Sequence, residues 1–600
     1  MAKAILLWDP RFPDRAPDRL LLDDAIASAA VRAGVAVAAN PEQQAELAAG
    51  GAISAADPVE MVLQHGIAAN TNRVMLPTAV ALIAAGLGLA QLVAGSLPAV
   101  TAAPRYVYAA AGLNPPIAFQ TVTSGTEYSF MKKWFALPEA CDHGYFIFCD
   151  KALNGAGANV HVAPGNTAQD WRVMTVEAVA GGAITQVQHP DNGNPIGPGN
   201  VWTRPANSIR AVRVGALAAG EYLWRGHDYV PVGGQRTISV APSSGMVTGE
   251  TSGASATPFD GTIPTGRVFS HTTAPSAFLA ILKSGKAVLV LGDSTEDRFS
   301  DSSNNNYNHG PIRELLTLAS NGGRVAVSGD CLSQSNLSTF LTTPLATYMN
   351  GAQFQEAMLA AIPGANQNYW PFTDAINEHF RNMSGTAATV TNAFIDLIWA
   401  KDPTVRIWGH SPYPYVQGTG ISGTTPATQF AVTADMQAVI PQGVAERDTF
   451  MTQTRSLLGG RYRGVFDHDV DLAPASPNQR LWKVGPTATM AVATIDDANG
   501  PTSITLTGVQ PLKGEYYVID PGGANQEGPF RTSVSNAATP SGGNWTVGNQ
   551  SNVRIVKAHP IGTPVVFIET ADGTHPTARY RFEVMNAPGM IAAKQALIAA

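Results

Sequence analysis

Two short motifs in the C-terminal half of the chain carry residue types that suit nucleophilic catalysis. Gly292-Asp293-Ser294 follows the apolar run at 288–291, so a buried strand would end in a turn that holds a serine. Asp572-Gly573-Thr574-His575 lies near the C-terminus, with the Asp three residues before the His and a Gly that allows a tight turn. A serine hydroxyl is a weak nucleophile at neutral pH and needs a base. The two motifs therefore indicate acyl transfer, with Ser294 as nucleophile, His575 as base and Asp572 orienting that base.

Acyl transfer also needs hydrogen-bond donors where the tetrahedral intermediate becomes negatively charged. The segment at 324–330 predicts a short strand that runs into a glycine turn, from which the backbone N–H of Gly329 would point into the site. The apolar run at 357–362 must end at Pro363, and the turn after it carries Asn366. We therefore expect the Gly329 N–H and the Asn366 side-chain amide to form the oxyanion hole.

On these residues the chain resembles the SGNH (GDSL) hydrolases, whose four signature residues are Ser, Gly, Asn and His in that order. The resemblance covers residues 271–482 and 566–600 and implies a doubly wound α/β core. The chain departs from the family pattern in two places. Gly-Xaa-Asn-Asp appears as Gly364-Ala365-Asn366-Gln367, and the stretch before the final motif is longer than the family needs, which predicts an inserted domain.

Two other polar groups have alternative interpretations. Asp467-His468-Asp469, with Asp471, is a rival acid/base cluster, but its position after a strand around Val465 favours a loop. Glu296 follows the serine on the expected first turns of a helix, together with Asp297 and Arg298. Acidic residues suit that end of a helix, so a solvated or capping role is expected. No cluster has metal-ligand spacing, so neither a metal nor another cofactor is expected.

Composition limits the partners and the fold class. The 600 residues carry a net charge of −7 and no basic block, which gives nucleic-acid binding no support. Charged residues make up only 14% of the chain, whereas there are 58 Gly and 42 Pro, which favours turn-rich β structure. The three cysteines, Cys141, Cys149 and Cys331, form neither a disulfide framework nor a metal site. Cys141 and Cys149 could pair across a hairpin, but reduced thiols are favoured.

Shifts in composition predict a multidomain chain. Residues 1–104 are Ala-rich, with helices expected at 19–34, 41–49 and 58–65, and form an anchoring or oligomerisation module. Residues 105–270 alternate short apolar runs with turns, as in a β-sandwich, and end in a linker at 252–265. Residues 271–482 alternate strands and helices and form the hydrolase core. An inserted β-sandwich-like domain follows at 483–565, and 566–600 complete the core with the Asp/His motif.

The N-terminal region shows no secretory signal, because its first apolar run is too short. The stretch at 79–97 is apolar apart from Gln91 and Ser96 and is long enough to cross a bilayer. It is rich in Ala, Leu and Gly and lacks aromatic anchors, so a helix buried between subunits is the alternative. The sequence leaves both possibilities open.

The expected function is a serine esterase that deacetylates a surface polysaccharide, because two β modules flank the catalytic core. The layout also resembles phage spike or fibre proteins, which implies a homo-oligomer that attaches to a virion through residues 1–104 and lies on the virion surface or outside the cell. Two alternatives remain: a catalytically inactive glycan-binding protein that recognises a receptor, and a bacterial lipid or acyl esterase.

Overall fold

A computed structural model gives the fold, and the chain divides into two compact units, Met1–Ala103 and Pro104–Ala600. The described residues are six strand segments of the first unit and most of the second. Ser294 and Thr295 lie outside them, as do the longer stretches 123–127, 154–161, 239–245, 252–266, 269–273, 297–309, 332–336, 343–347, 379–386, 414–442, 473–483 and 569–575. The Asp572 and His575 predictions therefore fall outside the described residues as well.

The described parts of the first unit are strands. Two three-stranded antiparallel sheets have the orders β2-β1-β3 and β5-β4-β6. Their strands are β1 (Lys3–Leu7), β2 (Asp18–Leu22), β3 (Ala36–Ala38), β4 (Pro58–Leu63), β5 (Arg73–Pro77) and β6 (Ala90–Leu92). The helices expected at 19–34 and 58–65 are wrong where β2 and β4 lie, because pairing with neighbouring strands outweighs helix propensity there.

The expected helix at 79–97 is wrong where β6 crosses it, and the rest of that stretch lies outside the described residues. Among the residues that the structure describes, no helix is long and apolar enough to cross a membrane.

The second unit begins with an eleven-stranded antiparallel sheet. Its order is β20-β19-β9-β17-β13-β14-β16-β10-β21-β7, with β15 beside β13. Aromatic side chains from both halves of this sheet meet in one core, where the Phe135 and Phe146 ring centroids lie 5.5 Å apart. The strands are β7 (Tyr106–Tyr108), β9 (Tyr128–Leu137), β10 (Gly144–Cys149), β13 (Gln169–Ala178), β14 (Ile184–Gln188), β15 (Trp202–Arg204), β16 (Ile209–Val214), β17 (Gly220–Tyr229), β19 (Met246–Thr251), β20 (Arg267–Val268) and β21 (Ala277–Ile281).

Two short two-stranded sheets accompany it, β18 (Gln235–Ile238) with β8 (Ala118–Thr121) and β11 (Lys151–Leu153) with β12 (Val162–Pro164). Strand β21 lies beyond residue 271, where the hydrolase core was expected to begin, so this β domain is longer than predicted. All three cysteines of the chain are buried free thiols.

The region predicted as the hydrolase core is built on a five-stranded sheet whose strands all run parallel. Its order is β23-β22-β24-β25-β26, formed by β22 (Ala287–Gly292), β23 (Ala326–Cys331), β24 (Asp374–Asn377), β25 (Arg406–His410) and β26 (Val465–Phe466). Strand β22 is buried along its whole length, as the continuous apolar run of a central parallel strand requires. The strands expected around 288–291, 325–327 and 405–408 are confirmed.

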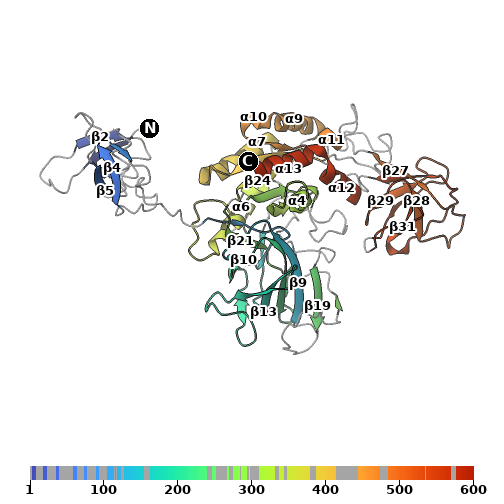
Figure 1. Ribbon diagram of the computed structural model, residues 1–600, viewed down its shortest axis with the longest axis horizontal. Helices are drawn as coiled ribbons and strands as arrows, with labels where there is room; N and C mark the ends of the chain where they lie inside the picture. Colours follow the sequence, from blue (N-terminus) through green and yellow to red (C-terminus); the bar gives the residue numbers. More distant parts are fainter. Residues whose placement is uncertain are drawn as a thin grey trace. The chain divides into compact units, whose positions relative to one another are not determined.

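Helices cover both faces of this sheet. One face packs against α5 (Leu337–Leu341), α6 (Gly351–Ala360), α7 (Ala387–Lys401) and α9 (Gly443–Arg455), and the other against α4 (Pro311–Thr317), α12 (Ala578–Asn586) and α13 (Pro588–Ala599). Helix α7 buries Val390, Phe394 and Ile398, a spacing that places apolar side chains on one face. Helices α12 and α13, red in Figure 1, contact α4, so the C-terminal segment belongs to this core.

The chain leaves the core after α10 (Leu457–Gly460) and α11 (Asp469–Leu472) and returns at α12. Between them lies a seven-stranded antiparallel sheet in the order β30-β29-β33-β27-β28-β32-β31, with its own apolar core. Its strands are β27 (Val484–Met490), β28 (Ser503–Thr507), β29 (Tyr516–Ile519), β30 (Glu527–Arg531), β31 (Thr539–Ser541), β32 (Asn544–Gly548) and β33 (Pro564–Ile568). Strand β33 extends this domain to residue 568, beyond the expected boundary at 565. The described chain is thus mostly β, with its helices gathered around the parallel sheet.

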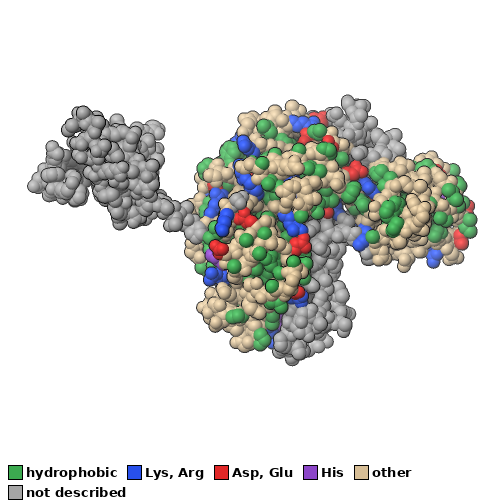
Figure 2. All heavy atoms as spheres, in the orientation of Figure 1, with side chains coloured by type: hydrophobic (Ala, Val, Ile, Leu, Met, Phe, Trp, Pro, Cys, Tyr) green, Lys and Arg blue, Asp and Glu red, His purple; other side chains and the backbone are tan. Residues whose placement is uncertain are grey.

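Charged side chains are sparse on the part of the surface that the structure describes. On the face drawn in Figure 2, Lys and Arg stand singly or in small groups among neutral and apolar side chains, and so do Asp and Glu. This agrees with the low charged fraction of the sequence, 14%.

The short helix α4 is held at its C-terminal end by a lysine from the end of the chain. The buried Lys594 Nζ donates to the carbonyl oxygens of Leu315, Leu318 and Ser320 at 2.8–2.9 Å. These carbonyls lie in the last turn of α4 and just after it, where the helix itself supplies no donor.

We therefore expect Lys594→Met to lower the free energy of unfolding by about 2–4 kcal/mol, because buried carbonyl oxygens lose their donor. Urea unfolding followed by fluorescence would measure this. Lys401→Met is the matched control, since Lys401 Nζ makes a partly exposed ion pair with Glu356 at 3.1 Å and lies 4.7 Å from the centre of the Trp370 ring. Together these contacts should contribute about 1 kcal/mol. Equal losses in the two variants would contradict the assignment.

Candidate functional site

The turn that carries Ser294 begins at the carboxyl end of β22. Ser294 itself lies outside the described residues, but its neighbours are held closely. The backbone N–H of Asp293 donates to Glu378 Oε2 at 3.2 Å, and Glu378 directly follows β24. A Cβ on Gly292 would lie 2.8 Å from Glu378 Oε2 and 2.8 Å from the Glu296 Cβ. Glycine at 292 is therefore required for both carboxylate side chains to approach this turn.

Glu296, two residues after Ser294, is fully buried, so the expected solvated role is wrong. Its Oε1 accepts hydrogen bonds from the Tyr413 hydroxyl at 2.7 Å and from the Ile312 N–H at 3.2 Å. Glu296 does cap a helix, but not one that begins at Glu296. It accepts from the Ile312 N–H in the first turn of α4. Burial raises the pKa of Glu296 to about 7, while the contacts with Tyr413 and Arg313 oppose this shift.

The same cluster reaches the segment that follows His575. The ring of Tyr413 stacks on His468 with centroids 4.7 Å apart, and His468 Nδ1 lies 2.7 Å from the Tyr580 hydroxyl. The centroids of Tyr413 and Tyr580 are 6.0 Å apart. Asp572 and His575 lie outside the described residues, but Tyr580 follows His575 by five positions. The flanks of both sequence motifs therefore converge on one buried cluster.

The rival cluster Asp467-His468-Asp469 is structural. His468 Nε2 lies 2.8 Å from the carbonyl oxygen of Ser411, so this nitrogen carries the hydrogen and Nδ1 accepts from Tyr580. Burial lowers the pKa of His468 and favours this neutral form. Arg455 pairs with Asp467 at 2.7 Å, and the buried Arg447 pairs with Asp469 at 3.3 Å. With both ring nitrogens engaged, His468 is not available as a base.

Gly329 lies inside strand β23, opposite Val290, so the expected turn at this position is wrong. A Cβ there would come within 2.5 Å of Nη1 of Arg313, whose Nη2 donates to the carbonyl oxygen of Glu296 at 2.7 Å. The Val327 N–H donates to Ala110 on the side away from β22. Because successive peptide groups of a strand point to alternate sides, the Gly329 N–H points to that side too and stays out of the ladder with β22.

Asn366 lies in the connection between α6 and β24, which enters the sheet at the amino end of β24. Its Oδ1 accepts from the backbone N–H of Asn368 at 2.9 Å, as in a self-contained polar turn. Ser294 follows the opposite, carboxyl end of the neighbouring strand β22. The six residues of β22 separate the two edges by roughly 16 Å. This corrects the expectation that Asn366 faces the same cavity as Ser294.

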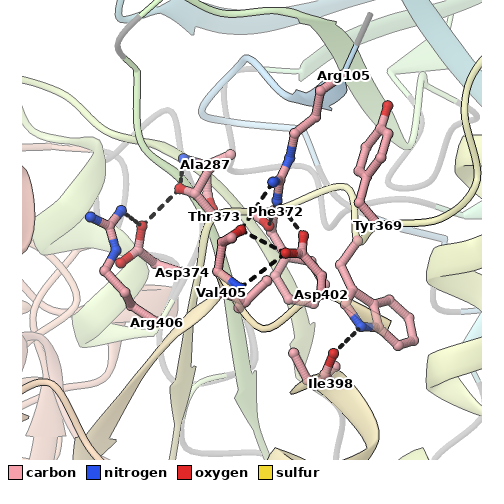
Figure 3. Close-up of polar contacts among 12 residues, drawn as sticks. Arg105, Ala287, Tyr369, Phe372, Thr373, Asp374, Ile398, Asp402, Val405 and Arg406 are labelled. Carbon is pink, nitrogen blue, oxygen red and sulfur yellow. Dashed lines mark hydrogen bonds and ion pairs between the residues drawn. The ribbon is translucent and has the colours of Figure 1, made fainter. Parts of the chain in front are cut away.

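Figure 3 shows the contacts that hold this amino edge together. Arg105 donates to Asp402 at 2.6 Å, and Arg406 donates to Asp374 at 2.7 Å. Just before β24, Thr373 Oγ1 accepts from the N–H of Ala287, the first residue of β22, at 3.0 Å. The connection that carries Asn366 is thus fixed to the edge of the sheet that lies away from Ser294.

Two polar residues at the carboxyl edge were missed in the sequence, and their positions at strand ends were the available signal. Asn377 ends β24, but its Nδ2 donates to Thr391 Oγ1 at 3.1 Å on α7. His410 ends β25 and is buried against the rings of Tyr413 and His468, with centroids at 5.0 and 5.2 Å. Within the described residues its ring nitrogens have no hydrogen-bond partner, and burial lowers its pKa well below the ordinary value, so it is neutral.

No protein-family model matches the chain, and no curated protein matches it. Among solved structures, a family two carbohydrate esterase from Cellvibrio japonicus is similar at 11% identity over 62% of this chain and 91% of that one, with a TM-score of 0.20. A family two carbohydrate esterase from Clostridium thermocellum, in complex with cellohexaose, matches at 11% identity over 60% and 88%, with a TM-score of 0.20. A GDSL-like lipase from Bacteroides ovatus matches at 12% identity over 59% and 77%, with a TM-score of 0.21. These similarities are weak, so the assignment of the site depends on the residues above.

The raised pKa of Glu296 predicts how stability changes with pH. The folded-state pKa, about 7, lies above the ordinary value of 4.5, so folding favours the protonated acid. The stabilisation is complete below pH 4.5 and is lost as the pH rises through 7. Glu296→Gln removes this titration and should shrink the fall in unfolding free energy between pH 5 and pH 8 by about 2–3 kcal/mol. Urea unfolding at both pH values checks this, and an unchanged difference would exclude a protonated Glu296.

Proposed function

We propose that this chain is a serine esterase whose triad is Ser294, His575 and Asp572. The observation that supports it best is the convergence of Glu296 and Tyr580 on the cluster of Tyr413 and His468. Two residues of chain span at most about 7 Å, so Ser294 lies close to Glu296. His575 lies two residues before Thr577, whose successor begins α12. Motifs about 280 residues apart in the sequence are thereby within reach of one another.

The order of the parallel strands supports a doubly wound SGNH core. Numbered along the chain, β23-β22-β24-β25-β26 is the order 2-1-3-4-5. Sheets of this kind place their sites outside the carboxyl ends of the strands, where the order reverses. That reversal lies between β22 and its neighbours, and Ser294 follows β22 by two residues.

In the proposed mechanism, Ser294 Oγ attacks the ester carbonyl while His575 takes its proton, and Asp572 orients the imidazole. His575 then returns the proton to the leaving alcohol, and water releases the acid from the acyl-enzyme by the same steps. The backbone N–H of Ser294 stabilises the oxyanion, whereas the Gly329 N–H points away from β22 and is left out of this role. Since Asn366 lies at the other edge of the sheet, we leave its side-chain amide out of this oxyanion hole.

As substrate we propose an acetylated polysaccharide, because β domains precede and interrupt the core as carbohydrate-binding modules would. This assignment is an analogy of layout and not of site chemistry. The same layout motivates the proposal of an oligomeric spike attached to a virion through residues 1–104. Release of acetate from purified bacterial polysaccharide tests the enzyme. Binding of the polysaccharide without acetate release would favour an inactive receptor-recognition protein.

Ser294→Ala should abolish labelling by a serine-directed organophosphonate, and His575→Ala should lower turnover of a small acetyl ester by at least about a thousandfold. The matched control is His468→Gln, which removes a buried structural histidine. It should lower the melting temperature and keep turnover per folded molecule within a few-fold of wild type. Labelling of Ser294→Ala, or the reverse behaviour of the two histidines, would refute the triad.

Asn366→Ala should keep turnover within about twofold of wild type, because Asn366 lies at the amino edge of the sheet. Removing an oxyanion-hole donor typically costs roughly a hundred- to a thousandfold, a loss that Asn366→Ala should not show. Measuring turnover and melting temperature on the same preparations separates loss of chemistry from loss of fold. A hundredfold loss in Asn366→Ala would restore the original assignment.

A further inference from the structure

The Asp/His motif lies in a connection whose two ends are fastened to each other. The connection joins β33, the last strand of the inserted domain, to α12 of the hydrolase core. Where it ends, the buried Thr577 Oγ1 donates to the carbonyl oxygen of Ile568, the last residue of β33, at 2.7 Å. The residues on either side of the motif, at the end of β33 and the start of α12, are therefore fastened to each other.

An ion pair fixes the start of α12 to the inserted domain. Arg579 Nε donates to Glu515 Oε1 at 2.6 Å, and Arg579 Nη2 donates to Glu515 Oε2 at 3.0 Å. Both side chains are buried, with exposed fractions of 7% and 0%. The same Nη2 donates to the carbonyl oxygen of Gln510 at 3.0 Å, and the guanidinium lies 5.1 Å from the centre of the Phe567 ring on β33. Arg579 thus contacts the inserted domain at two separate places.

Arg579 occupies an unfavourable place for a basic residue, since the first turn of a helix attracts negative charge. Glu515 offsets this cost and is itself rigidly placed. Its Oε2 accepts from the Leu512 N–H at 2.5 Å, and its own N–H donates to Thr532 Oγ1 at 2.9 Å. A two-bond arginine–carboxylate pair fixes orientation as well as distance. The pair therefore sets the angle at which α12, and the chain just before it, leave the inserted domain.

We propose that Glu515 of the inserted β domain, acting through Arg579, is a positioning residue for His575, so that the inserted domain is a working part of the esterase site. This inference rests on the proposed function. His575 precedes Arg579 by four residues. Displacing a catalytic base by about 1 Å can lower the reaction rate about a hundredfold. The inserted domain then contributes to catalysis without touching the substrate.

The test compares Glu515→Gln, which keeps the shape but removes the charge, with Glu527→Gln. Glu527 is the matched control because it is a buried carboxylate of the same domain, paired with His559 at 2.8 Å and placed away from α12. For each full-length variant, kcat and KM on a small acetyl ester and the melting temperature are measured. We expect Glu515→Gln to lower kcat roughly 10- to 100-fold with KM within twofold, and Glu527→Gln to lower only the melting temperature. Arg579→Lys, which keeps the charge but loses the two-bond geometry, should also lower kcat and serves if Glu515→Gln fails to fold.

A double-variant cycle with His575→Ala shows whether Glu515 acts through His575. Once the base is removed, Glu515→Gln should cause no further loss in the residual rate. Unchanged kcat in Glu515→Gln and Arg579→Lys, or a loss that persists in full in the His575→Ala background, would overturn the inference and leave the triad standing. Wild-type turnover in His575→Ala would instead overturn the triad and, with it, this inference.

Discussion

The buried carboxyl group of Glu296 connects parts of the parallel-sheet domain that lie far apart in the sequence. Burying a carboxylate is costly unless hydrogen bonds compensate for the lost water. Here the Tyr413 hydroxyl, 117 residues away, and the first turn of α4 provide them. The backbone of Glu296 is also tightly packed, because a Cβ on Gly310 would lie 2.3 Å from the Glu296 Cα. Glu296, two residues after Ser294, is therefore fixed by contacts on several sides.

From Glu296 the same constraint continues to the C-terminal end of the chain. The ring of Tyr413 stacks on His468, and His468 accepts a hydrogen bond from the Tyr580 hydroxyl. His468, Tyr413 and Tyr580 therefore link Glu296 to helix α12 by fixed contacts. A histidine whose two nitrogens are bonded within a protein core cannot also shuttle protons. The arrangement thus argues against His468 as the base of the proposed triad.

The sequence predicted the parts of this site that depend on local pattern. A continuous apolar run that ends in Gly-Asp-Ser indicates a central strand, and β22 lies there. Asn366 was misplaced because the apolar run before it is the end of helix α6, and short apolar runs do not separate helices from strands. The strand that follows, Asp374–Asn377, is four residues long and half polar, so it gives no hydrophobic signal. The burial of Glu296 depends on Tyr413, a contact that no local pattern encodes.

Gly329 has a role that the sequence predicts, in the oxyanion hole, and a packing role that the structure shows. The oxyanion role predicted from the sequence needs only a backbone N–H, which any residue except proline would supply. The packing role needs the absence of a side chain, since Arg313 passes where a Cβ would be and reaches the carbonyl oxygen of Glu296. An alanine at 329 would keep the N–H and displace Arg313, and with it the support of the turn after β22. The requirement for glycine at this position therefore comes from the packing of Arg313 and not from an oxyanion role.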